Sequence, residues 1–149
     1  MAEEIRRVDY YYASVPDKPG EAARVLAALH GAGVNLLGFS GFPHGARRSQ
    51  LDFLPDNSAA FTQAARKAGL KLSKKKSGFL IQGDDHPGVM AEVLGRLARV
   101  GINATATQGI CAGAGRYGAL LWVKQADLRR AAKALGAGQS SSLAASLAK

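Results

Sequence analysis

Two short loops carry the residues of this sequence that could bind a small polar molecule. The first is Asp17-Lys18-Pro19-Gly20, and the second is Asp85-His86-Pro87-Gly88. An aspartate can accept hydrogen bonds from an ammonium group. Proline and glycine suit the start of a helix, whose free N–H groups attract a carboxylate. Each loop therefore offers partners for both ends of a free amino acid.

An asparagine follows each loop at the same distance, Asn35 after the first and Asn103 after the second. Its side-chain amide can both donate and accept a hydrogen bond. When residues 17–35 are placed over residues 85–103 without a gap, nine of nineteen positions are identical at a shift of 68. The identical pairs are Asp17/Asp85, Pro19/Pro87, Gly20/Gly88, Ala23/Ala91, Val25/Val93, Leu26/Leu94, Leu29/Leu97, Gly33/Gly101 and Asn35/Asn103. Such self-similarity indicates two copies of one structural module.

A purely structural interpretation of both motifs stays open. Aspartate before Pro-Gly is a suitable helix cap, and asparagine after glycine tolerates the geometry of a turn. The two copies also differ, because Val15 stands near the first motif where Gly83 stands near the second. The second loop has His86 where the first has Lys18. If only one copy binds a ligand, we expect it to be the second.

Hydrophobic periodicity and turn residues predict the same order of elements around each motif. The first copy is expected to form strand, helix, strand, strand, helix and strand at residues 8–15, 21–30, 34–42, 48–54, 59–68 and 70–72. The second copy is expected to repeat this order at residues 78–83, 88–100, 102–110, 118–123 and 127–135. That order predicts an α+β protein of two ferredoxin-like βαββαβ modules, with antiparallel sheets and helices on one face.

The ends of the modules follow from the same pattern. We expect a first domain at residues 8–76 and a second at residues 77–136. Residues 137–149 are rich in serine and alanine and contain no β-branched residue, which makes them a poor fourth strand. They are expected to form a flexible or weakly helical tail.

Composition narrows the classes of function. With 47% hydrophobic and 21% charged residues, the chain is typical of a soluble globular protein. It has neither a signal-peptide core nor an apolar run near the roughly 20 residues of a membrane helix, so we expect a cytoplasmic protein without membrane contact. Cys111 is the single cysteine and the histidines lack metal-ligand spacing, so no metal site, cofactor or catalytic centre is expected.

Two weak motifs have simpler interpretations. Residues 113–118 fit the pattern Gly-x-Gly-x-x-Gly, but a strand is expected after them where a dinucleotide site needs a helix. We interpret them as a hairpin. Cys111 lies beside this hairpin, and a nucleophile would need a nearby base, for which His86 is the plausible candidate. An idle or packed thiol is the favoured interpretation.

Nucleic-acid binding is the main alternative from another class. The net charge is +9, and six basic residues fall within eleven positions: Arg66, Lys67, Lys71, Lys74, Lys75 and Lys76. RNA-recognition domains share the predicted topology, and residues 76–81 faintly resemble their basic-glycine-aromatic strand. The further aromatic residues that stack bases are missing. This basic junction between the modules is therefore interpreted as a solvated surface, and nucleic acid is an unlikely partner.

The repeated pattern resembles the ACT domain. The resemblance rests on a strand, Asp-x-Pro-Gly, a helix with Val-Leu and Leu on its inner face, and Gly-Val/Ile-Asn opening a strand, in modules of about 70 residues. It covers residues 8–76 and 78–136. It implies a stand-alone tandem ACT protein, a regulatory sensor of a small molecule, expected to be an amino acid, without enzyme activity.

The resemblance also implies partners and a place for the ligand. ACT ligands often lie at the seam between modules, which would combine Asp17 and Gly20 with Asn103, and Asp85 and Gly88 with Asn35. A homodimer is expected, with Tyr10, Tyr12 and Trp122 as candidates for its contact face. A regulated enzyme of amino-acid metabolism, to which the protein would serve as a dimerising subunit, is a further expected partner.

Overall fold

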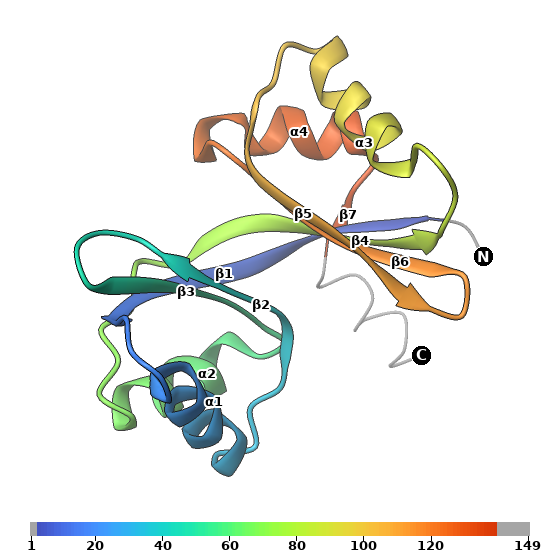
Figure 1. Ribbon diagram of the computed structural model, residues 1–149. Helices are drawn as coiled ribbons and strands as arrows, with labels where there is room; N and C mark the ends of the chain where they lie inside the picture. Colours follow the sequence, from blue (N-terminus) through green and yellow to red (C-terminus); the bar gives the residue numbers. More distant parts are fainter. Residues whose placement is uncertain (1–2, 140–149) are drawn as a thin grey trace, which may run out of the picture. The chain divides into compact units, whose positions relative to one another are not determined.

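Strand β1 (Glu4–Pro16) contributes to both of the units into which the chain folds (Figure 1). The structure is a computed structural model and describes residues 3–139. One unit, called the first unit here, is Asp9–Lys76. The second unit comprises the chain up to Val8 and the chain from Ser77 onward. The first residues of β1 therefore belong to the second unit, and its remainder belongs to the first.

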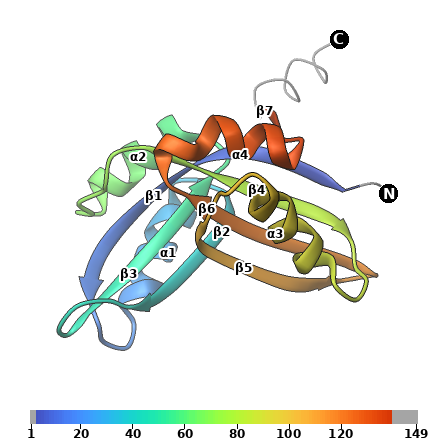
Figure 2. The ribbon, with the colours of Figure 1, turned by 90° about the horizontal axis from the view of Figure 1, so that it is seen from above.

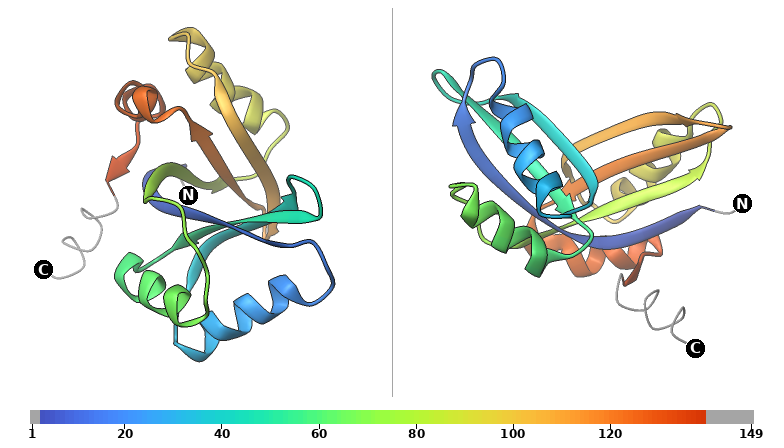
Figure 3. Two further views of the ribbon diagram at one scale, coloured as in Figure 1. Left: turned by 90° about the vertical axis from the view of Figure 1, so that its left-hand side faces the viewer. Right: turned by 90° about the horizontal axis from the view of Figure 1, so that it is seen from below.

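The first unit has the predicted order of strands and helices. After β1 come α1 (Glu21–Gly31), β2 (Leu36–Pro43), β3 (Arg48–Pro55) and α2 (Ser58–Lys67). Strand β3 pairs antiparallel with both β1 and β2. Both helices lie on one face of these strands (Figure 3). The helix-start signal before α2 is confirmed, because the Asn57 side chain accepts a hydrogen bond from the N–H of Ala60.

The core of the first unit follows from the alternation of the strands. Successive strand residues point to opposite faces, so Tyr11, Ala13 and Val15 turn toward the helices. The apolar stripe of α1 adds Val25 and Leu29, which are four positions apart and are fully buried.

The predicted fourth strand of this unit is shorter than expected. Residues 70–72 contribute an isolated antiparallel bridge between Leu72 and Ala13. Ser73 extends it by donating from its N–H to the Tyr12 carbonyl at 2.8 Å. The following lysines favour solvent, and Lys74 and Lys75 are exposed.

The second unit repeats the order of elements. It contains β4 (Lys76–Asp84), α3 (Val89–Arg99), β5 (Ala104–Gly113), β6 (Arg116–Val123), a 3₁₀ turn (Gln125–Asp127) and α4 (Leu128–Leu135). Strand β6 pairs antiparallel with β4 and β5, and β5 and β6 form a long hairpin (Figure 2). Its core gathers residues of β4, α3, β6 and α4 around the fully buried Phe79, Ile81 and Leu121.

The start of β1 lies beside β4, where the fourth strand of a second module would be expected. Gly83 of β4 lies against Glu3, and Ile5 is part of this unit's core. The short strand β7 (Gly138–Gln139) pairs parallel with β1 at Arg6 and Arg7. Ile5 supplies a β-branched apolar side chain, a type that the sequence of the tail does not contain. Of the expected tail, residues 137–149, the part from residue 140 lies outside the described residues.

The predicted fold class is confirmed as α+β and ferredoxin-like, with antiparallel strands and helices. Among residues 3–139, none of the helices combines the length and the apolar character needed to cross a bilayer.

Candidate functional site

The loop before α1 is held in place by its neighbouring hairpin. The N–H of Asp17 donates to the Arg47 carbonyl at 2.9 Å. The hydroxyl of Ser49, on β3, donates to Asp17 Oδ1 at 2.9 Å. The helix then begins after Gly20, whose φ of 90° is in the left-handed region that glycine tolerates best. Backbone and side-chain contacts together fix the Asp17 carboxylate.

The structure rules out helix capping as the role of the two aspartates. Gly20 is the N-cap of α1 and Gly88 is the N-cap of α3, and neither helix start has a side-chain cap. Asp17 bonds instead to Ser49, and Asp85 accepts from Cys111. The capping interpretation of the sequence was therefore wrong.

The start of α1 leaves donors available for a ligand. The N–H of Glu21 donates to Lys18 at 3.4 Å, and the N–H of Arg24 donates to Gly20 at 2.9 Å. The N–H groups of Ala22 and Ala23 have no backbone acceptor in the described part of the chain. Such free donors attract anionic groups at a helix start.

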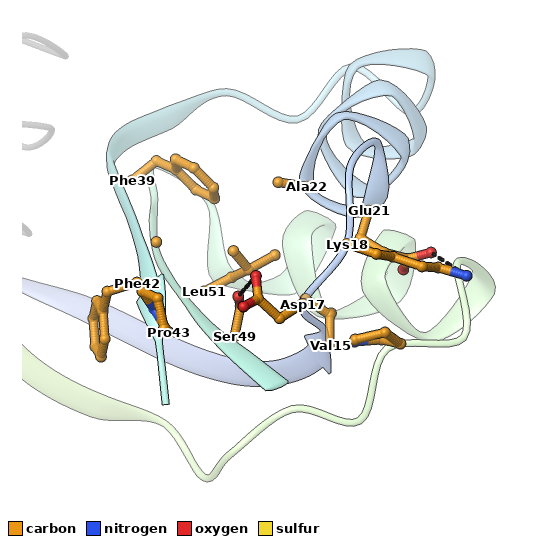
Figure 4. A pocket seen from close by; sticks show the side chains of 12 residues that line it. Val15, Asp17, Lys18, Glu21, Ala22, Phe39, Phe42, Pro43, Ser49 and Leu51 are labelled. Carbon is orange, nitrogen blue, oxygen red and sulfur yellow. Dashed lines mark hydrogen bonds and ion pairs between the residues drawn. The ribbon is translucent and has the colours of Figure 1, made fainter. Parts of the chain in front are cut away.

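A pocket of about 400 Å³ lies between this helix start and the strands of the first unit (Figure 4). Its lining residues come from the loop, from α1 and from the ends of β1, β2 and β3: Val15, Pro16, Asp17, Lys18, Glu21, Ala22, Phe39, Gly41, Phe42, Pro43, Ser49 and Leu51. Figure 4 shows the Asp17 carboxylate beside Ser49, with the side chains of Leu51 and Phe39 forming an apolar floor. The volume suits a molecule the size of an amino acid.

The charges at the pocket are unequally satisfied. Glu21 faces two cations, with Lys18 Nζ at 3.9 Å and Arg24 at 3.2 Å. Asp17 forms no ion pair with a described Lys, Arg or His, and its Oδ2 has no hydrogen-bond donor among the described residues. The pocket therefore presents one carboxylate that can still receive a cation.

The loop of the second unit has the same backbone anchor but different side-chain contacts. The N–H of Asp85 donates to the Gly115 carbonyl at 2.8 Å, as that of Asp17 does to Arg47. The thiol of Cys111 donates to Asp85 Oδ2 at 3.1 Å. This hydrogen bond and the negative charge of Asp85 raise the pKa of Cys111. A thiol with a raised pKa forms less of the nucleophilic thiolate at neutral pH.

Side chains fill the corresponding space in the second unit. Met90 stands where the first unit has Ala22, and its Cγ and Sδ lie 3.2 and 3.3 Å from where a Cβ on Gly109 would be. Tyr117 stands where the first unit has Ser49, and its ring lies against Gly83. Its hydroxyl donates to Glu3, and burial together with this neighbour raises the pKa of Tyr117 to about 12.

The structure separates each predicted asparagine from the loop of its own unit. Asn35 follows the last turn of α1, whereas Asp17 precedes its first turn, and eleven residues of helix span about 16 Å. Asn103 and Asp85 lie at opposite ends of α3 in the same way. Asn35 and Asn103 are exposed. Their pairing with the loop of the other module stays a prediction.

The remaining predicted residues lie on the exposed loops. Lys18 lines the pocket, and Pro19 leads into the N-cap. His86 lies 3.8 Å from Glu92 and its Nδ1 contacts the Pro87 carbonyl at 3.0 Å. Cys111 is therefore in contact with Asp85, whereas His86, its candidate base, contacts Glu92 and the Pro87 carbonyl.

Two alternative interpretations can be examined directly. Residues 114 and 115 form the turn between β5 and β6, and residues 116–118 begin β6, which confirms the predicted hairpin. Phe79, the aromatic residue of the RNA-binding resemblance, is fully buried under the helices and is unavailable for stacking on bases. Two of the residues expected on a dimer contact face can also be placed. The ring of Tyr12 has Lys76 over it at 5.1 Å, and Trp122 is buried within the chain.

Sequence reasoning missed Ala22, Phe39, Ser49 and Leu51 as pocket residues. The repeat could have indicated them, because its alignment continues beyond the motif: Gly41 and Gly109 coincide at the same shift of 68 positions. At the same shift, Ala22 aligns with Met90 and Ser49 with Tyr117. These differences in size mark the positions that separate an open site from a filled one.

No family model matches this sequence, and no curated protein matches it. Solved structures do share its fold. A protein from Bacteroides thetaiotaomicron aligns with a TM-score of 0.72 at 16% identity, covering 87% of this chain and 88% of that one.

Two regulatory subunits of aspartate kinase are also similar. The subunit from Thermus thermophilus has a TM-score of 0.65 at 19% identity, with 91% and 95% of the two chains covered. The subunit from Thermus flavus has a TM-score of 0.58 at 18% identity, with 91% and 94% covered. At these identities the likeness establishes a common fold over most of each chain.

Proposed function

We propose that this protein is a non-catalytic regulatory module of the ACT type that binds a free amino acid in the pocket of the first unit. The observation that carries the proposal is the pairing of a fixed, unneutralised carboxylate, Asp17, with the open start of α1 in a pocket of about 400 Å³. An amino acid has an ammonium group for the first and a carboxylate for the second.

The physical basis is complementarity at both ends of a zwitterion. Asp17 uses one oxygen for Ser49 and can accept an ammonium hydrogen bond on the other. Charge-assisted hydrogen bonds of this kind are about twice as strong as neutral ones. The N–H groups of Ala22 and Ala23 can receive the carboxylate. A neutral amine or a simple carboxylic acid would satisfy one end and forgo the other.

The proposal places the ligand in the first copy, which reverses the expectation from the sequence. In the second copy Met90 and Tyr117 occupy the equivalent space, and Cys111 engages Asp85. His86 and Gly83 suggested that the second site would be the better one, but both have contacts within the second unit. His86 faces Glu92, and Gly83 accommodates the ring of Tyr117.

The solved structures that share this fold support a regulatory role. The two Thermus structures are named as regulatory subunits of aspartate kinase, and this chain aligns with nearly their whole length. By analogy we propose that amino-acid binding here controls an enzyme of amino-acid metabolism as its partner. The ACT assignment, the tandem organisation and the homodimer are parts of the same proposal.

A thermal-shift screen of the twenty amino acids tests this function. A ligand at 100 times its dissociation constant stabilises a folded protein by about 2.7 kcal/mol, which raises the melting temperature by several degrees. We expect at least one amino acid to do so with the wild type, and we expect its shift to fall to about half or less with Asp17→Asn. Asp85→Asn is the matched control and should retain the shift. If none of the twenty amino acids raises the melting temperature at millimolar concentration, the proposal is refuted.

A further inference from the structure

The chain between α2 and β4 forms an open edge of the first unit. Leu70 is buried in the core of this unit, and Leu72 packs against the same core. The bridge between Leu72 and Ala13 attaches the segment to one side of β1. Within the described part of the chain, no strand pairs with the other side of residues 70–73. A second chain can therefore reach this edge.

The backbone at the edge has free hydrogen-bonding groups. The N–H of Ser73 donates to the Tyr12 carbonyl at 2.8 Å, so it points toward β1. Successive residues of a strand direct their N–H and C=O groups to opposite sides, so those of Leu72 point away from β1. Neither group of Leu72 has a hydrogen-bond partner among the described residues. Such unpaired groups are a template on which another extended chain can form hydrogen bonds.

The basic junction gives this edge its charge. It holds six of the ten basic residues in residues 9–76, which contain five acidic ones, so the positive excess of the first unit lies there. Lys71, Lys74 and Lys75 are exposed and form no ion pair with another described residue. A chain that pairs with Leu72 would therefore lie among three uncompensated positive charges.

A structural role explains part of the basic junction. Arg66 and Lys67 lie in the last turn of α2, where the helix dipole favours positive charge. Lysines at a sheet edge also prevent pairing between copies of one protein. Lys71, Lys74 and Lys75 would repel the same edge of a second copy in this way. The same three charges would attract a strand that carries acidic side chains.

Charge and backbone together define the partner. We propose that this edge binds an extended, acidic segment of a partner protein, which adds to the sheet as a short strand. Main-chain hydrogen bonds to Leu72 would fix its register, and its carboxylates would pair with the lysines. A nucleic acid has the charge but lacks the peptide groups that match Leu72. A membrane surface fits poorly, because none of the exposed large apolar side chains of the described residues lies within residues 66–76.

Fluorescence anisotropy of the full chain with labelled peptides tests this inference. The probe alternates glutamate with threonine, which favours strands. One control replaces glutamate with glutamine. The other replaces threonine with proline, which has no N–H for strand pairing. We expect the probe to bind at least about tenfold more tightly than either control in about 0.1 M salt, where charges more than about 10 Å apart are largely screened.

A matched pair of variants locates the site. The triple variant Lys71→Gln, Lys74→Gln and Lys75→Gln should weaken binding of the probe by about tenfold, because each exposed charge pair contributes modestly. The triple variant Lys124→Gln, Arg129→Gln and Lys133→Gln removes the same charge from exposed positions of the second unit. It should change the affinity by less than about threefold.

The outcomes are independent of the amino-acid pocket. Equal binding of the proline peptide would overturn the strand pairing, and equal binding of the glutamine peptide would overturn the role of charge. Tighter binding of an oligouridylate with the same number of negative charges would overturn the choice of a protein segment. Equal losses in the two triple variants would overturn the location. If the probe does not bind the wild type, this inference is refuted, while the thermal-shift screen still decides the proposed function.

Discussion

The two units share a loop framework and differ in what fills the space beside it. In both, an aspartate N–H is anchored to the hairpin, and the following helix begins at a glycine in the left-handed region. In the first unit the small residues Ala22 and Ser49 leave a pocket. In the second, Met90 and Tyr117 stand at those positions and pack onto Gly109 and Gly83.

The difference shows that the repeated motif specifies the backbone of the loop. Side chains at other positions decide whether the space beside the loop is open or filled. Asp-x-Pro-Gly recurs because both loops need the same turn into a helix. Whether a ligand can enter depends on a few side chains outside the motif, and exchanging these between the units provides the most direct tests.

The largest expected effect is on the pair that closes the second unit. Gly83 faces Tyr117 across β4 and β6, and an added Cβ would lie 2.8 Å from its ring. Gly83→Val, which introduces the residue of the first unit, should destabilise the protein by about 1–3 kcal/mol through overpacking. The measurement is the free energy of unfolding in urea.

The double exchange Gly83→Val with Tyr117→Ser reproduces the pair Val15 and Ser49 of the first unit. Contacting residues couple, so the double variant should be less destabilised than the sum of the single variants, by about 1 kcal/mol. If the destabilisation of the double variant equals the sum of the two single variants, a side chain at position 83 does not clash with the ring of Tyr117.

A smaller effect is expected where the units exchange alanine and methionine. Met90→Ala removes a half-buried side chain packed on Gly109 and should cost about 2 kcal/mol of stability. Ala22→Met places the same side chain into the open pocket, so it should cost less than about 1 kcal/mol. Urea unfolding of both variants compares them, and equal costs would contradict the account of one filled and one open space.

The smallest effect concerns the thiol found in the second unit, where the first has Pro43 at the aligned position. Asp85 raises the pKa of Cys111 by accepting its hydrogen bond and by its negative charge. Asp85→Asn removes the charge, so the pKa should fall and the reactive thiolate should form at lower pH. The rate of reaction with a disulfide reagent, followed across the range of thiol ionisation, should therefore shift toward lower pH. An unchanged profile would contradict the contact.

Much of the fold could be predicted from the sequence because its signals are local. The periodic Val25 and Leu29 gave α1, and Asn57 gave the start of α2. The position of Ile5 beside β4 could not be predicted in this way, since it depends on pairing between distant segments. The basic residues after Leu70 did not indicate that the fourth strand would shrink to a bridge.

The site was only partly predictable for a related reason. The loop residues Asp17 and Gly20 follow from their own motif, but Phe39, Ser49 and Leu51 reach the pocket through the pairing of β2 and β3. The expectation that favoured the second copy compared only residues next to the motif, and the proposed function reverses it. The residues that matter for space, Met90 and Tyr117, are aligned with the first copy only through the full repeat.

The most direct test of the central claim is the stoichiometry of amino-acid binding, measured by isothermal titration of the wild type, Asp17→Asn and Asp85→Asn. The account predicts one site per chain, an affinity loss of about tenfold or more in Asp17→Asn, and unchanged affinity in Asp85→Asn. Two sites per chain, or a loss confined to Asp85→Asn, would contradict it.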